Sequence, residues 1–210
     1  EINALPHSVA HFSLFLGFEG DIEHAGATRS NHWIYPTGKV DVIWTDAPEQ
    51  PPPGMFVSFA SLKDSAHDPG PSQKSAGEIV AWTDWSVVKQ WADLEPNARG
   101  DGYEEFKTAV EDVLFAQFEK YFPDLAQLVV FRNLSTPLST EAITGHHHGG
   151  FYGIDVTPER VLSGALQAKT PVPGLILAGQ DVLSPGIPGA LWGGIFAAAC
   201  VDPKVWRELP

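Results

Sequence analysis

Apolar and polar residues alternate with a period of two in the first part of the chain. The clearest run is Val9–Phe18, where the apolar set is Ala10, Phe12, Leu14, Leu16 and Phe18. This alternation predicts a β-strand with one buried face. Further strands are predicted at Asn31–Pro36, Val40–Thr45, Met55–Leu62, Gly77–Trp82 and Leu128–Phe131. Since most of these strands follow one another without an intervening helix, we expect a mixed, largely antiparallel sheet.

Proline-rich and polar segments separate the predicted strands. Ala47–Gly54 contains Pro48, Pro51, Pro52 and Pro53, and Lys63–Ala76 is polar with a Pro-Gly-Pro turn. Both segments are predicted to be surface loops. Thr136–Ser139 is also predicted to be a loop, leaving the last strand of the sheet.

The apolar period changes to that of a helix between Gly100 and Pro123. Apolar residues recur at helical spacing, namely Tyr103, Phe106, Val110, Val113, Leu114, Phe118 and Tyr121. Asp101 is the expected N-cap, with Glu104 completing a capping box. Pro123 ends the helix after Phe122. We expect this helix to cover one face of the sheet.

A second pattern, near the C-terminus, organises the rest of the chain. Leu175–Ala178 is a short apolar run between glycines and predicts a buried strand. A turn at Ser184–Pro188 leads into a helix that reaches Val201. Gly189, Gly193 and Ala197 fall on one face of this helix. Because each helical glycine costs about 1 kcal/mol, close approach of another group is implied. Either a bound cofactor or tight helix packing would explain it, and the pattern leaves both interpretations open.

Composition and charge exclude several classes of partner. The net charge is −13 over 210 residues, which argues against nucleic acid and anionic membrane surfaces. The single cysteine, Cys200, is interpreted as a small core residue. The apolar helix is too short to span a bilayer. We expect a cytoplasmic location, with peripheral membrane attachment as the alternative. The start at Glu1 suggests a piece of a longer protein.

Few residues carry an obvious chemical motif. His146, His147 and His148 invite a metal interpretation, but no Cys or HExxH partner accompanies them, so a solvated run without metal is favoured. No GxSxG, P-loop or paired cysteine nucleophile occurs. The seven tryptophans are interpreted mainly as core and sheet-face residues, with an apolar substrate pocket as the alternative.

Several segments together resemble a flavoprotein family, that of phytoene desaturases, carotenoid isomerases and retinol saturases. The C-terminal segments are Thr136–Leu138, Gly150–Gly153, Pro173–Asp181 and Gly186–Gly194. Upstream, Phe56–Asp64 and Tyr103–Lys107 are most similar to the retinol-saturase branch. The resemblance spans most of the chain, and it is most specific in order and spacing over Val172–Ala199.

The resemblance implies an α/β (α+β) fold with two parts. Residues 1–135 would form part of a substrate-domain sheet covered by the long helix, and residues 136–210 the C-terminal strand–helix return of a Rossmann-like FAD-binding domain. The implied cofactor is FAD, held near Gly179, Gln180, Asp181, Gly186, Ile187, Gly189 and Ala190. Asp181 would lie at the ribitol–pyrophosphate region, and the backbone of Ile187, Gly189 and Ala190 at the pyrimidine edge. Tyr152 is a candidate polar group near the flavin, although an ordinary packed tyrosine is the simpler interpretation.

The implied function is that of the C-terminal part of an FAD-dependent oxidoreductase. It would act on carbon–carbon bonds of an apolar isoprenoid or polyene, as a saturase or a desaturase. The GxGxxG of such families is absent from this sequence. We therefore expect the isolated chain to bind little or no FAD, to be inactive, and to need the missing N-terminal dinucleotide-binding half. The alternative is a non-catalytic binding module that keeps the fold without the cofactor.

Overall fold

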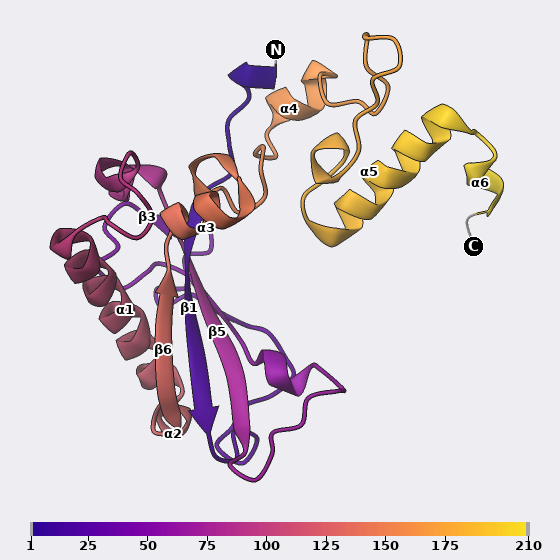
Figure 1. Ribbon diagram of the computed structural model, residues 1–210. Coiled ribbons are helices and arrows are strands. Elements are labelled where there is room, and N and C mark those ends of the chain that lie inside the picture. Colours follow the sequence, from indigo (N-terminus) through magenta and orange to yellow (C-terminus); the bar gives the residue numbers. More distant parts are fainter. Residues whose placement is uncertain (1, 209–210) are drawn as a thin grey trace. The chain divides into compact units, whose positions relative to one another are not determined.

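A computed structural model describes residues 2–208 and divides the chain into two compact units (Figure 1). The larger unit comprises residues 9–149. The smaller unit combines residues 2–8 with residues 150–208. The assignment of residues 1–135 and 136–210 to a substrate part and a flavin part stays a prediction.

A six-stranded sheet forms the centre of the larger unit. Its strands are β1 (Ala10–Glu19), β2 (His32–Ile34), β3 (Trp44–Thr45), β4 (Met55–Ser58), β5 (Lys74–Thr83) and β6 (Val129–Ser135). The order is β2-β4-β5-β1-β6, with β3 beside β5. All pairs are antiparallel except β3–β5, so the mixed, largely antiparallel sheet is confirmed.

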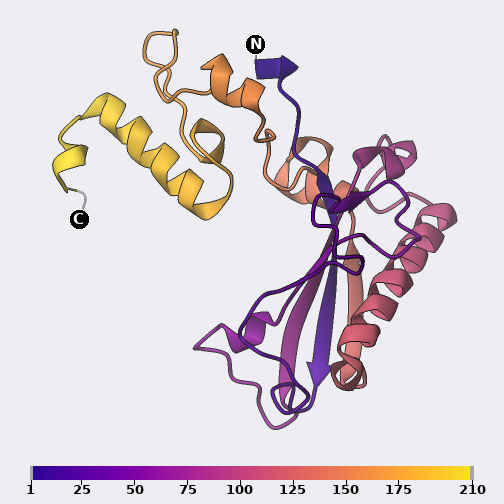
Figure 2. The same cartoon turned by 180° about the vertical axis from the view of Figure 1, so that it is seen from behind.

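The long helix α1 (Asp101–Tyr121) covers one face of this sheet, as expected (Figure 2). Alternate residues of β1 point toward it, and the rings of Phe12 and Phe106 lie 6.1 Å apart, those of Phe18 and Phe118 6.2 Å. Arg132 of β6 pairs with Glu111 of α1 at 3.0 Å. The core therefore lies between α1 and the face of the sheet that carries these phenylalanines.

Several local predictions for this unit are wrong. The strand predicted at Val40–Thr45 is limited to Trp44–Thr45, and Ala60–Leu62 forms a 3-10 turn instead of ending a strand. The loop predicted at Lys63–Ala76 ends earlier, because β5 already begins at Lys74. Gly100, with φ 81°, is the N-cap of α1, and its carbonyl accepts from the amide of Tyr103. Asp101 is already helical, so its side chain comes one residue too late to cap the helix. The predicted loop after β6 is a helix, α3 (Pro137–Thr144), because proline suits the first helical position. Ser139 Oγ accepts from the Thr136 amide and supports this helix start.

Short helical segments complete the larger unit. They are α2 (Pro123–Ala126) and the 3-10 turns η2 (Ala60–Leu62), η3 (Trp85–Val87), η4 (Lys89–Trp91) and η5 (His147–Gly149). Among the residues described, no helix is both long and apolar enough to cross a membrane.

The smaller unit is helical and loop-rich. It contains η1 (Ile2–Ala4), α4 (Pro158–Ser163), η6 (Gln180–Val182), α5 (Gly186–Val201) and α6 (Val205–Glu208). The helix predicted to reach Val201 is confirmed, with Pro188 in its first turn.

The buried strand predicted at Leu175–Ala178 is wrong. This segment makes one isolated bridge, between Lys169 and Ile176, and Leu175 is exposed. An apolar run needs a neighbouring strand to form a ladder, and no such strand lies in the described part of this unit. The Rossmann-like assignment is thus not confirmed.

Cys200 is also exposed, contrary to the core interpretation. Helix α5 is apolar on all sides, and within its unit it buries mainly the side that carries Gly189 and Gly193. Its other sides are therefore open in this unit.

Candidate functional site

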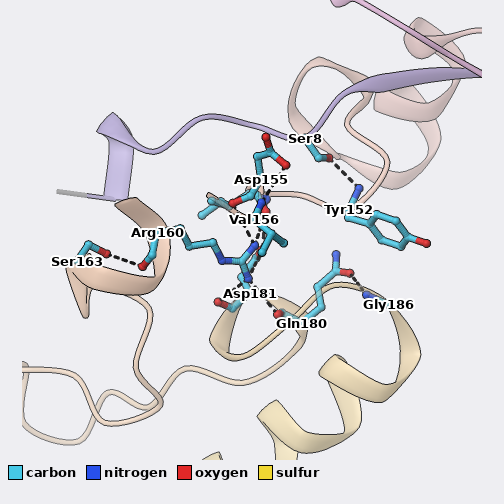
Figure 3. A network of polar contacts seen from close by, with 10 residues as sticks. Ser8, Tyr152, Asp155, Val156, Arg160, Ser163, Gln180, Asp181 and Gly186 are labelled. Atoms are coloured by element: carbon cyan, nitrogen blue, oxygen red, sulfur yellow. Dashed lines mark hydrogen bonds and ion pairs between the residues drawn. The ribbon is translucent and has the colours of Figure 1, made fainter. Parts of the chain in front are cut away.

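A buried arginine lies at the centre of the polar network in the smaller unit (Figure 3). Arg160, on α4, is 5% exposed. Its guanidinium donates to the carbonyl oxygens of Ile154, Gln180 (3.2 Å) and Asp181 (3.0 Å). Thr157 Oγ1 accepts from the Arg160 amide at 3.2 Å and fixes the start of α4. Arg160 therefore ties the loop before α4 to the turn that contains Asp181.

Asp181, the predicted cofactor ligand, has structural partners of its own. Its Oδ1 accepts from the Ile154 amide at 3.2 Å and lies 3.7 Å from Arg160 Nη2. Its side chain is still 38% exposed. A carboxylate has about four acceptor positions, so capacity remains for a ligand hydroxyl. These partners lie in the preceding loop and on α4 rather than in the turn that follows Asp181.

The first turn of α5 is largely satisfied within the chain. The first four backbone N–H groups of a helix have no acceptor within the helix. In α5 these four positions are Pro185, Gly186, Ile187 and Pro188. The two prolines have no N–H, and Gly186 donates to Gln180 Oε1 at 3.1 Å. Of these four positions, Ile187 is therefore the one whose N–H has no acceptor within the described part of the chain. One amide suits a carbonyl oxygen better than a phosphate.

The glycines on α5 explain how closely the turn and the helix pack. A Cβ at Gly189 would overlap the Ser184 carbonyl oxygen, and one at Gly193 the Gly179 carbonyl oxygen. A Cβ at Gly194 would meet nothing within 4 Å. Close packing thus accounts for Gly189 and Gly193. The positive φ values of Gly179 (100°) and Gly186 (82°) shape the turn between them.

The remaining predicted site residues lie on the open side of this turn. Ile187 is 86% exposed, and Ala190, one helical turn further on, is also exposed. Tyr152 donates its amide to Ser8 Oγ at 2.9 Å, and its ring lies edge-on to Phe151. Taken together, the turn offers a carboxylate, one free amide and an exposed apolar edge. This set of groups fits a planar ring with carbonyl groups that is joined to a hydroxyl-bearing chain, and FAD has both in its flavin ring and ribityl chain.

In the histidine run His146 is half-buried, whereas His147 and His148 are exposed and pack against the larger unit. His147 and His148 stack on each other, and His148 stacks on Trp85 with ring centres 5.0 Å apart. No group of three or more potential metal ligands occurs in the described residues. Nearby His11, on β1, is half-buried, and this burial, with a smaller contribution from His146, lowers its pKa to about 4.

The face of the sheet opposite α1 carries a second candidate site. Register pairs place Trp33, Phe56 and Trp82 on this side, and Trp33 stacks on Trp82 at 5.4 Å and meets Phe56 edge-on at 5.3 Å. Trp33 itself is 54% exposed. Other exposed aromatic residues of the same face are Phe15, Trp44 and Phe131. We call this set the aromatic face. Trp33 and Trp44 are therefore sheet-face rather than core residues, and this face can bind a flat apolar molecule.

Sequence reasoning missed Arg160. The signal was the Thr-Pro-Glu start of a short helix, which predicts an N-cap at Thr157. That signal places Arg160 in a first helical turn, but it does not predict burial, because arginine is normally exposed.

Comparison with known proteins gives relatives of one kind. The chain is 24% identical to an all-trans-retinol 13,14-reductase of Danio rerio over 211 residues, covering 96% of this chain and 35% of the relative. The Homo sapiens all-trans-retinol 13,14-reductase is 25% identical over 199 residues, covering 90% and 33%. A Danio rerio protein described as an inactive all-trans-retinol 13,14-reductase is 28% identical over 212 residues, covering 95% and 34%.

These relatives confirm the resemblance to retinol saturases, and the chain corresponds to their C-terminal part. It spans about one third of the length of the curated relatives it matches. No family model matches the chain.

Proposed function

We propose that this chain is the C-terminal part of an FAD-dependent oxidoreductase that saturates a carbon–carbon double bond of an apolar polyene. The observation that carries the proposal is the aromatic face, on which Phe15, Trp33, Trp44 and Phe131 are each between 43% and 56% exposed. Reduction is favoured over desaturation because the active relatives are named as reductases of all-trans-retinol.

The turn at Gly179–Ala190 is the proposed flavin contact of this chain. Asp181 would accept a hydrogen bond from a cofactor hydroxyl, and the Ile187 amide would donate to a ring carbonyl. The exposed Ile187 and Ala190 would lie against the ring edge. When bound, the flavin supplies the hydride chemistry, which no side chain of this sequence can provide.

The residues of the chain itself would bind and orient the substrate. The rings of Trp33, Phe15 and Phe131 offer a flat apolar surface to a rigid polyene, and its burial removes water from the reacting bond. Tyr152 stays the candidate polar group near the flavin. Because the proposed phosphate-binding GxGxxG lies outside this sequence, the 210-residue chain alone should retain little FAD and show no turnover.

Product analysis of the complete reading frame tests this function. The protein should carry FAD and convert all-trans-retinol into a product with two additional hydrogen atoms. Trp33→Ala should raise KM, whereas Val40→Ala, which removes an exposed apolar side chain outside the aromatic face, should not. Absence of a reduced product from a flavin-loaded protein would overturn the proposal.

A non-catalytic binding module is the second candidate function. It is favoured by the similarity to the relative described as inactive. The two functions separate on the reading frame upstream of Glu1, because a flavoprotein needs an in-frame GxGxxG there. They separate again on the purified complete protein, which would lack flavin absorbance if it were a module.

A further inference from the structure

One polar row crosses the aromatic face. Ser58 of β4 lies directly opposite Glu78 of β5, and Glu78 lies opposite Phe15 of β1. Residues opposed in this way have Cβ atoms about 5 Å apart. Val57 and Ile79, the neighbours of Ser58 and Glu78, point into the core beneath α1, so Ser58 and Glu78 point to the aromatic face.

Lys63 returns to this row after the short turn η2. Its ammonium donates to Ser58 Oγ at 2.6 Å and to Asn31 Oδ1. Ser58 is only 8% exposed, so this contact fixes a charged donor at the edge of the apolar surface. An ammonium has three donors, and these contacts use two of them. Ser58 and Lys63 both lie in Phe56–Asp64, one of the segments that resemble the retinol-saturase branch.

Glu78 supplies an acceptor beside this donor. It is half-buried next to Phe15, and within residues 2–208 no ion pair within 4.0 Å joins it to Lys63. The row therefore holds a positive donor and a negative acceptor that do not neutralise each other directly. A hydroxyl group can accept from the first and donate to the second at the same time. A carboxylate could accept from Lys63 but would be repelled by Glu78, and an ether has no proton to donate.

We propose that Lys63 and Glu78 form a hydroxyl-binding end of the aromatic face, and that they select an apolar molecule with a terminal alcohol. The apolar body would lie on the aromatic rings, with Trp33 on one side of the row and Phe131 on the other. This inference rests on the proposed function, since it assigns the orientation of the substrate on the same surface.

Binding measurements test this inference without any need for turnover. Quenching of tryptophan fluorescence in the complete protein would be titrated with all-trans-retinol, its methyl ether, the corresponding carboxylic acid and the hydrocarbon that lacks oxygen. The alcohol should bind about tenfold more tightly than the ether, and also more tightly than the acid, which Glu78 repels. Glu78→Gln should reduce the preference for alcohol over ether and improve binding of the acid. Lys63→Met should weaken alcohol and ether alike by about tenfold.

Matched controls separate this role from a structural one. Lys39→Met and Glu105→Gln change the same residue types at exposed positions away from the row and should leave all four affinities unchanged. The hydrocarbon should bind equally to every variant, because it makes no polar contact. If Lys63→Met weakened the hydrocarbon as much as the alcohol, Lys63 would be structural and the inference wrong.

The outcomes also distinguish this inference from the proposed function. Equal affinity for alcohol, ether and acid would overturn the hydroxyl-binding end and leave the polyene surface intact. Failure of all four probes to bind would overturn both.

Discussion

The side chain of Arg160 contacts Asp181 at two points, the backbone carbonyl and the side-chain carboxylate of Asp181. The guanidinium donates to the Asp181 carbonyl at 3.0 Å and lies 3.7 Å from the carboxylate. The same guanidinium reaches the carbonyls of Ile154 and Gln180. A residue proposed as a cofactor ligand is therefore held in place by a buried cation 21 positions earlier in the chain.

Replacing Arg160 should loosen the whole turn. Arg160→Met keeps the apolar stem but leaves several buried carbonyl oxygens without a donor, so we expect a loss of about 2–4 kcal/mol in unfolding free energy. Arg160→Lys should recover part of this loss, since a lysine makes fewer contacts. Chemical denaturation followed by tryptophan fluorescence would measure both. Arg29→Met, at an exposed position, is the control, and an equal effect there would contradict the assignment.

The contacts of Asp181 change what its replacement should do. Asp181→Ala removes the acceptor for the Ile154 amide as well as the proposed cofactor ligand, so we expect a lower thermal midpoint together with weaker FAD binding. Asp181→Asn keeps a neutral acceptor for Ile154, and it should largely restore the midpoint. Its FAD affinity should stay about tenfold reduced, because the charge is missing. A mutant Asp181→Asn with normal flavin affinity would show that the carboxylate is only structural.

Two adjacent glycines of α5 should respond in opposite directions. A methyl group at Gly193 would overlap the Gly179 carbonyl oxygen, so Gly193→Ala should destabilise the smaller unit by roughly 1–3 kcal/mol. Gly194 has open space around it, so Gly194→Ala should stabilise the helix by up to about 1 kcal/mol. Thermal unfolding would measure the midpoint of each variant. A similar shift of the midpoint in both variants would refute the packing explanation.

The sequence predicted the larger unit well because its signals are local. The alternation in β1 and the helical period of α1 each mark one buried face, and these two faces pack against residues of the same unit. The start of α3 was not predicted because a Thr-Pro pair is as typical of a turn as of a helix N-terminus. The cap of α1 was missed by one residue, since Gly100 rather than Asp101 has the non-helical conformation.

The candidate site was only partly predictable, for two different reasons. The close packing of Gly189 and Gly193 followed from the cost of helical glycine, although the neighbour proved to be the chain itself. The strand expected at Leu175–Ala178 did not form, because a strand depends on a partner that the period alone cannot supply. The aromatic face and the Lys63–Ser58 contact depend on strand register, which no local pattern in this sequence specifies.

Acid should destabilise the larger unit through His11. Its folded pKa of about 4 lies below the ordinary value of 6.5, so the unfolded chain binds the proton more tightly. The resulting stability is present above pH 6.5 and is lost as the pH falls toward 4, by about 3 kcal/mol at most. His11→Gln should remove this pH-dependent contribution. The difference in unfolding free energy between wild type and variant should therefore change between pH 6.5 and pH 4. A difference that stays constant with pH would exclude His11 as the cause.

The central claim is that the protein moves a hydride from a flavin to a polyene double bond. The most direct measurement is an anaerobic single turnover, in which the complete protein with reduced flavin is mixed with all-trans-retinol. Flavin and polyene absorbance would be followed together. The proposed function predicts that one double bond is lost for each flavin reoxidised. Flavin that stays reduced beside unchanged polyene, in a protein shown to bind both, would contradict it.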